Sequence, residues 1–194
     1  MMSAVRRLIS RIVLKIYVIH PLSRLWWLFL ICFVMWTLLA VIVIRLRREK
    51  FWRICCGILS VLFVAILVHI TVVSRGETAN RELILRPFFS FYLARTMNWD
   101  FYREMLMNVF LFFPLGLMLP FGLSGWKRPV LRAVLIGLLI SVCIETIQYF
   151  FALGWPETDD VIMNTLGVLA GSLSFGTTKF LMRNVRGDAI RDAD

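Results

Sequence analysis

The sequence predicts an all-α integral membrane protein: a helical bundle of about five transmembrane helices, with an interfacial helix before the first. Of its 194 residues, 60% are hydrophobic and 18% are charged, whereas soluble domains are typically about 45–50% apolar and about 25% charged. The apolar residues also fall into five runs, each with the roughly 17–25 residues that a helix needs to cross a bilayer. These runs are residues 25–44, 54–73, 105–123, 133–153 and 161–180.

The segment before the first run, residues 4–20, carries its basic residues on one side. Arg7, Arg11 and Lys15 recur every four residues, and aliphatic residues occupy the opposite side. A helix with this pattern lies in the membrane interface, although an ordinary basic flank before the first span is an equal alternative. The expected domains are an N-terminal part with the first span (1–50), a multi-pass domain (51–183) and a cytoplasmic tail (184–194).

The net charge of +10 does not indicate nucleic-acid binding. No compact basic module is visible, and a membrane chain places Lys and Arg at its helix ends. Basic residues are dense in the 45–53 connection and in the tail, and such loops stay in the cytoplasm. The sequence therefore predicts a multi-pass protein of the cell membrane with its N-terminus outside and its C-terminus in the cytoplasm. Connections 74–104 and 154–160 then share the outer side.

No cofactor or metal is expected. The four cysteines lie in apolar runs without histidines at ligand spacing, so we interpret them as small buried apolar residues. They are Cys32, Cys55, Cys56 and Cys143. The sequence carries no signal for the oligomeric state.

The fourth run contains a carboxylate, Glu145. An ionisable residue inside a membrane span costs roughly 3 kcal/mol on insertion scales, so it is a functional candidate by default. Ser141 and Gln148 share its helix face, at i, i+4 and i+7 spacing. No Lys or Arg occurs from 133 to 178, while this stretch has four acids: Glu145, Glu157, Asp159 and Asp160.

The fifth run has a matching stripe in which Asp160 and Asn164 are followed by Gly167 and Gly171. Two small residues four positions apart let another helix approach closely. Because the turn between the fourth and fifth runs is short, we expect the two spans to pack antiparallel with their stripes together. The aspartates would then lie at the mouth of the site and Glu145 deeper.

The third run adds Glu104 and Asn108, one helical turn apart, and contains Pro114 and Pro120. Proline removes a backbone donor. These positions favour a structural kink, with an interruption of the helix that lines a cavity as the alternative.

The connection before the third run mixes arginines with aromatic residues that suit the headgroup level of a membrane. Arg75, Arg81 and Arg86 are the candidates to meet the acidic stripe or to hold a phosphate through paired donors. Anchoring in the interface alone is the alternative.

Four motifs, in this order and spacing, resemble the VanZ-like family of small membrane proteins over about residues 74–183. They are Ser74-Arg75 with Leu83-Ile-Leu-Arg86-Pro87-Phe88; Asn108-Val-Phe-Leu-Phe-Phe-Pro114-Leu-Gly116; Glu145-Thr-Ile-Gln148; and Asp159-Asp160-Val-Ile-Met-Asn164-Thr-Leu-Gly167. The resemblance implies a multi-pass protein and a link to resistance against the glycopeptide teicoplanin, but no particular reaction. Such proteins often carry Asn-Leu-Ile-Pro-Phe where this chain has an added arginine beside the proline.

Together these patterns predict a polar site that opens to the extracytoplasmic face. The candidate acid/base groups are Glu145, Asp159 and Asp160. The candidate ligand-binding residues are Arg75, Arg86, Asn108, Gln148 and Asn164. The expected partners are membrane lipids and a lipid-linked envelope precursor or glycopeptide, which the site would recognise or modify. An ion- or proton-coupled carrier and a protein that only packs against a partner are the alternatives, so whether the chain is an enzyme stays open.

Overall fold

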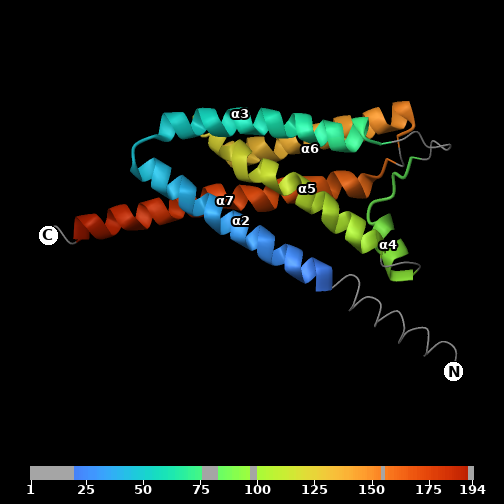
Figure 1. Ribbon diagram of the computed structural model, residues 1–194, viewed down its shortest axis with the longest axis horizontal. Helices are drawn as coiled ribbons and strands as arrows, with labels where there is room; N and C mark the ends of the chain where they lie inside the picture. Colours follow the sequence, from blue (N-terminus) through green and yellow to red (C-terminus); the bar gives the residue numbers. More distant parts are fainter. Residues whose placement is uncertain (1–19, 76–82, 97–99, 154–155, 192–194) are drawn as a thin grey trace, which may run out of the picture.

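The computed structural model describes residues 20–75, 83–96, 100–153 and 156–191, which are almost entirely helical (Figure 1). Within these ranges, five helices are long and apolar enough to cross a membrane, as the sequence predicts. They are α2 (His20–Arg45), α3 (Glu49–Val68), α5 (Asp100–Gly122), α6 (Pro129–Phe151) and α7 (Thr158–Arg191). Apart from His20, the interfacial helix predicted over 4–20 lies outside the described residues.

Two short elements complete the chain trace. A π-helical segment, η2 (His69–Val73), continues α3, and a short helix, α4 (Phe89–Thr96), precedes α5. Both lie at the same end of the bundle, where η2 also packs against α6 and α4 packs against α5. Short π-helical segments occur often at functional sites, so this end is where the site is to be sought.

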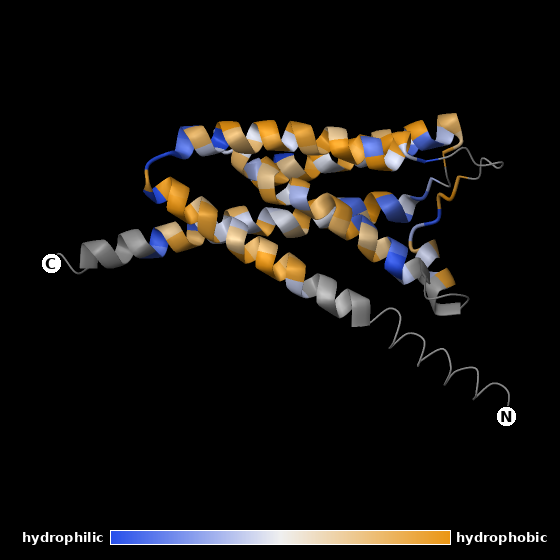
Figure 2. Ribbon diagram, viewed as in Figure 1, coloured by the Kyte–Doolittle hydropathy of each residue, from blue (hydrophilic) through white to orange (hydrophobic). Residues whose placement is uncertain are grey.

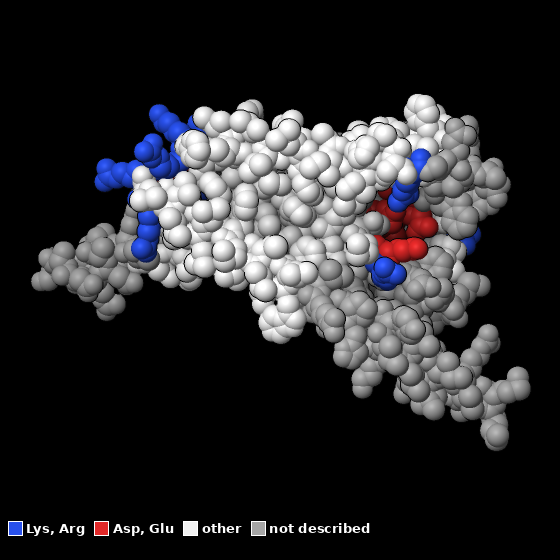
Figure 3. All heavy atoms as spheres, in the orientation of Figure 1, with Lys and Arg blue, Asp and Glu red and all other residues white. Residues whose placement is uncertain are grey.

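The bundle has two chemically different ends (Figures 1 and 2). We call the end with residues 45–53, 123–132 and 179–183 the basic end, and the end with residues 71–75, 84–96, 100–104, 145–153 and 156–160 the acidic end. Figure 3 shows Lys and Arg side chains gathered at the first and Asp and Glu atoms in a recess at the second. The positive-inside rule makes the basic end the predicted cytoplasmic one.

The outer faces of the peripheral helices are apolar. Leu38 on α2, Ile58 on α3 and Leu139 on α6 are all exposed, and hydrophobic colouring predominates along α3 and the coloured part of α2 in Figure 2. Apolar side chains can be exposed over such lengths in the hydrocarbon core of a membrane. There, only backbone and polar groups need hydrogen-bond partners within the protein. These helices are therefore in contact with membrane lipid.

The cysteines are all free, but only Cys56 is buried; Cys32 and Cys143 are exposed and Cys55 is half-buried. The expectation that all four are buried is therefore wrong. A thiol is a small apolar group, so in a membrane span it faces lipid as readily as it faces the core.

Helices α5 and α7 form the centre of the bundle and are more buried than the other spans. They run in the same direction. Helix α6, which lies between them in the chain, runs in the opposite direction. Gly167 and Gly171 of α7 lie against the backbone of α5 at Val109 and Phe113, and Gly116 of α5 lies against the backbone of α7. A Cβ at any of these glycines would overlap a carbonyl oxygen of the opposite helix. The two backbones are therefore in direct contact.

The glycines of α7 thus face α5, and the expectation that its whole stripe faces α6 is wrong. Of the polar residues in the stripe, Asn164 meets α6, where its Nδ2 donates a hydrogen bond to Ser141 Oγ (2.9 Å). Glycine on both partners permits the closest approach of two helices. Because α5 supplies Gly116 at the level of Val168, it is the better partner for the small residues.

Helix α5 continues through both of its prolines to Gly122. The helix interruption, which the sequence leaves open as the alternative to a kink, is absent from this fully traced helix. Pro120 is fully buried and Pro114 is half-buried. The carbonyl groups that each proline leaves without an N–H partner are thus held within the protein, where helices tolerate them.

We expect Gly171→Ala to destabilise the bundle, because the added methyl group would overlap the Phe113 carbonyl and push α5 and α7 apart. Overpacking of this kind costs about 1–3 kcal/mol, which should lower the midpoint of unfolding in detergent. Gly176→Ala is the matched control on the same helix, since no atom lies within 4 Å of its Cβ position. Because alanine has a higher helix propensity than glycine, the unfolding midpoint of Gly176→Ala should stay the same or rise. Equal losses in both variants would contradict the close contact.

Candidate functional site

The segment before α4 is fastened to the start of α7. Ile84 and Glu157 form a parallel β-bridge. The Ile84 N–H donates to the Pro156 carbonyl (3.0 Å), and the Thr158 N–H donates to the Ile84 carbonyl (3.1 Å). This pairing joins residues 74 positions apart in the chain and closes the acidic end over the helices.

Asp159 anchors the same segment. Its carboxylate accepts hydrogen bonds from the Phe88 N–H (2.5 Å) and the Ser90 N–H (2.7 Å), and its side chain is only 2% exposed. Phe88 has a φ of 61°, a left-handed conformation that costs a non-glycine residue roughly 1–2 kcal/mol. Backbone amides around such a residue form a concavity that binds anions. The Asp159 carboxylate fills it, so both of its oxygens are already used by the backbone.

Glu145 lies beneath the turn that leads into α7. Its Oε2 accepts a hydrogen bond from the Glu157 N–H (3.2 Å), and its side chain is 9% exposed. Because α6 ends at Phe151, Glu145 is about 9 Å of helix from the acidic end, nearer to it than the middle of the span where its sequence position places it. Its carboxylate thus contacts the described start of the segment that leads into α7.

Asp160 faces α5, where its Oδ1 accepts a hydrogen bond from Asn108 Nδ2 (2.6 Å). Glu104, exposed one turn before Asn108, interacts electrostatically with Asp160. Arg75, two residues after η2, is an exposed cation within electrostatic range of both Asp160 and Glu145. In the part of the chain that the structure describes, its guanidinium forms no ion pair as short as 4.0 Å. Arg75 is thus placed where its charge acts on both carboxylates.

Two buried amides complete the site. Gln148 and Asn164 are 1% and 4% exposed, and Gln148 Nε2 donates to the Thr71 carbonyl of η2 (2.8 Å). Gln148 Oε1 and Asn164 Oδ1 have no hydrogen-bond partner among the residues placed by the structure. An unpartnered buried acceptor costs about 1–3 kcal/mol. A ligand or a water molecule that donates a hydrogen bond to either oxygen would therefore bind favourably at this position.

The structure brings most of the predicted site residues to the acidic end. Arg86 is exposed there, and its main-chain carbonyl accepts a hydrogen bond from the Phe89 N–H (3.3 Å). Arg81 lies outside the described residues. Those that gather around the turn into α7 are Arg75, Asn108, Glu145, Gln148, Asp159, Asp160 and Asn164. Their predicted roles in binding and acid/base chemistry stay predictions.

Sequence reasoning missed Ser90 and Thr71. Ser90 donates its Oγ hydrogen to Glu157 Oε2 (2.6 Å), but nothing in the sequence separates this serine from others at the same end. Thr71 acts through its main-chain carbonyl, which no side-chain pattern can indicate. Only the structure could identify these two contacts.

No group of three or more His, Cys, Asp or Glu side chains within the described ranges has an arrangement that could hold a metal ion. The carboxylates are instead matched with backbone N–H, hydroxyl and amide donors. Glu145 and Asp160 each keep an oxygen beyond the hydrogen bonds described here. The arrangement can therefore accept donors from a ligand or exchange a proton with it.

Glu157, outside the spanning segments, has a perturbed carboxyl. Burial raises its pKa above the ordinary value of 4.5, and the charges of Asp159 and Glu104 act in the same direction, whereas the hydrogen bond from Ser90 lowers it. Together these effects favour the protonated form of the Glu157 carboxyl more than water does for a free carboxyl.

We expect Asp159→Asn to loosen the segment before α4, because an amide offers one acceptor oxygen where the carboxylate offers two. Hydrogen bonds to charged groups contribute about 1.5–3 kcal/mol, so the free energy of unfolding should fall by a similar amount. Hydrogen exchange at the Phe88 and Ser90 amides should accelerate. Asp160→Asn is the control, since it keeps an acceptor for Asn108 and leaves those amides bonded. Unchanged exchange in Asp159→Asn would argue against the anchor.

The raised pKa of Glu157 should make stability depend on pH. A carboxyl with a higher pKa in the folded state binds its proton more tightly there. Its contribution to the free energy of unfolding is therefore present at low pH and is lost as the pH rises through the folded pKa. Between roughly pH 4 and pH 7, the unfolding midpoint of the wild type should fall by more than that of Glu157→Gln. The glutamine cannot ionise but still accepts from Ser90. Superimposable pH profiles would refute this assignment.

Comparison with known proteins agrees with this architecture. The sequence profile of the VanZ/LLP1 family matches residues 27–179. Protein VanZ of Enterococcus faecium is 33% identical over 110 residues, which cover 57% of this chain and 62% of that protein, so the similarity spans less than two thirds of that relative. No solved structure matches this chain. Because the family profile covers most of the chain, including all the helices that build the acidic end, the chain belongs to the VanZ/LLP1 family of membrane proteins.

Proposed function

We propose that the acidic end binds a polar ligand of the cell envelope, either a glycopeptide or a lipid-linked cell-wall precursor. The observation that carries this proposal is the excess of acceptors at one place. Glu145 and Asp160 lie on neighbouring helices, and the unpartnered oxygens of Gln148 and Asn164 lie one turn from them. Glycopeptides and lipid-linked precursors carry many amide N–H and sugar hydroxyl donors. Buried acceptors select such ligands, because leaving them unpaired is costly.

The position of the site supports the same class of ligand. The acidic atoms are visible in a recess near the acidic end of the bundle, with basic side chains on either side of it (Figure 3). Arg75 is exposed there, and a guanidinium holds a phosphate or carboxylate through paired donors. A lipid-linked precursor has a phosphate at the headgroup level and polar groups above it. The recess lies at that level if the acidic end faces outward, as the charge distribution predicts.

Membership of the VanZ/LLP1 family supports a role at the cell envelope. The link of the VanZ-like family to teicoplanin extends the proposal: this chain contributes to resistance against such glycopeptides by binding the drug or the precursor that the drug attacks. Binding accounts for the site with fewer assumptions than a reaction. Asp159 is occupied by the backbone, which leaves Glu145 and Asp160 as the carboxylates available for acid/base chemistry.

A proton-coupled carrier is the second candidate, because carboxylates in spanning helices occur along proton pathways. The buried position of Glu145 favours it. The broken helices that line carrier sites have no counterpart in α5, which is continuous. This candidate therefore depends on Glu145 and Asp160 alone.

Glu145→Gln and Asp160→Asn test the binding site, because each removes a charge and keeps an oxygen for the existing hydrogen bond. We expect teicoplanin, or a lipid-linked precursor, to bind each variant in nanodiscs about tenfold more weakly, the effect of one weakened charged hydrogen bond. Glu49→Gln, which removes a carboxylate at the basic end, should bind like the wild type. In a glycopeptide-susceptible host, the two site variants should confer less protection at equal membrane levels.

Two outcomes would overturn the proposal. Wild-type binding and protection by both site variants, with normal insertion, would show that the acidic end is not the site. Proton-dependent uptake into proteoliposomes that Glu145→Gln abolishes, without binding of either ligand, would favour the carrier.

A further inference from the structure

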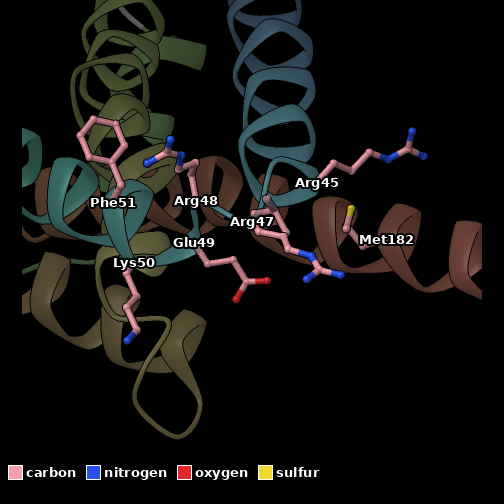
Figure 4. Close-up of a pocket in the computed structure, with 8 residues that line it drawn as sticks. Arg45, Arg47, Arg48, Glu49, Lys50, Phe51 and Met182 are labelled. Atoms are coloured by element: carbon pink, nitrogen blue, oxygen red, sulfur yellow. The ribbon is translucent and has the colours of Figure 1, made fainter.

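A second hollow lies at the other end of the bundle. A cavity of about 600 Å³ opens between α2, α3, α5 and α7, a size typical of ligand sites. A neighbouring hollow of about 640 Å³ beside the α2–α3 turn shares four lining residues with it. Figure 4 shows Arg47 and Glu49 extending from this turn on the side where Met182 of α7 lies. We call the two hollows together the basic cavity.

The lining of the basic cavity is strongly cationic. Its basic residues come from the α2–α3 turn, the first turns of α3 and the last part of α7, and its one carboxylate is Glu49. Helix α3 begins here, without a side-chain cap, so the positive end of its dipole adds to the field. The basic residues are Arg45, Arg47, Arg48, Lys50, Arg53, Lys179 and Arg183.

Two of these cations are held in place. The Lys179 ammonium lies 4.7 Å from the centroid of the Phe175 ring, a cation–π arrangement. The Arg53 guanidinium lies against Gly125 of the α5–α6 turn, where a Cβ would overlap it. Positive charges that are already ordered lose less entropy when an anion binds.

The cavity also contains a buried donor without an acceptor. Trp52 lines it and is 8% exposed. Its indole Nε1–H has no hydrogen-bond partner among the described residues. A buried N–H is normally paired, so an acceptor on a ligand in the cavity that reached this nitrogen would be stabilised. The positive-inside rule explains basic loops, but it requires neither a cavity nor an unpaired indole.

We propose that the basic cavity binds the phosphate headgroup of an anionic phospholipid. Phosphate oxygens match the cations and the indole donor at once. The apolar part of the lining, which includes Ile44, Phe121 and Met182, suits the glycerol and the start of the acyl chains. This favours a lipid over free phosphate. Basic pockets between spanning helices on the cytoplasmic side bind such headgroups. The site is separate from the acidic end and does not depend on its function.

Native mass spectrometry of the purified full chain tests this, with phosphatidylglycerol and phosphatidylcholine as probes and inorganic phosphate as competitor. One phosphatidylglycerol should bind at least about tenfold more tightly than phosphatidylcholine. Arg53→Gln with Lys179→Gln should weaken phosphatidylglycerol binding about thirtyfold, the effect of two lost basic contacts. Lys127→Gln with Arg132→Gln is the matched control. It removes two charges from the same end but from residues that do not line the cavity, and should change affinity by less than about threefold.

Trp52→Phe keeps an aromatic ring and loses the N–H, and should weaken phosphatidylglycerol about fivefold. This variant tests the site even if the double variant fails to fold. Equal losses in the two double variants would show a general surface-charge effect and overturn the site. Equal affinity for the two lipids would also overturn it. Displacement by inorganic phosphate at concentrations matching the lipid would show that the ligand is free phosphate and refute the lipid assignment.

Discussion

The direct backbone contact between α5 and α7 is the constraint on which the acidic end depends. Gly116, Gly167 and Gly171 fix both the distance and the register of the two helices. In that register Asn108 meets Asp160, and the start of α7 lies where it can pair with the segment around Ile84. A shift of one residue would turn the polar side chains of α7 by about 100° away from α5. The packing of α5 against α7 therefore determines where the residues of the site lie.

The acidic residues at this end have different surroundings and hence different tasks. Asp159 binds two backbone amides and holds a strained turn. Glu157 contributes its N–H to Glu145 and its carboxylate to Ser90. Glu145 and Asp160 each accept one hydrogen bond from the described residues, through Oε2 and Oδ1. The carboxylates at this end thus differ in their hydrogen-bond partners. The difference depends on which backbone and side-chain groups each carboxylate reaches.

The sequence predicts the spanning helices well and the site only in part, for physical reasons. Five apolar runs define five spans because bilayer thickness fixes the length of a helix. Helical spacing shows that Gly167 and Asp160 share a stripe, but it does not show which helix the stripe faces, and α5 proved to be the partner of the glycines. The anchoring contacts of Asp159 follow from the φ of Phe88 and from a β-bridge between distant segments. Neither feature leaves a local pattern in the sequence.

The position of α7 in the chain has a consequence for biogenesis. Because α7 follows the other described spans, it leaves the ribosome after them. Until it inserts, Asn108 and Ser141 lack their partners, Glu145 lies uncovered, and the amides of Phe88 and Ser90 face no carboxylate. A chain that stalls before this helix would present these unpaired polar groups to the lipid, where each is costly. The docking of α7 therefore completes the hydrogen bonds of these polar groups.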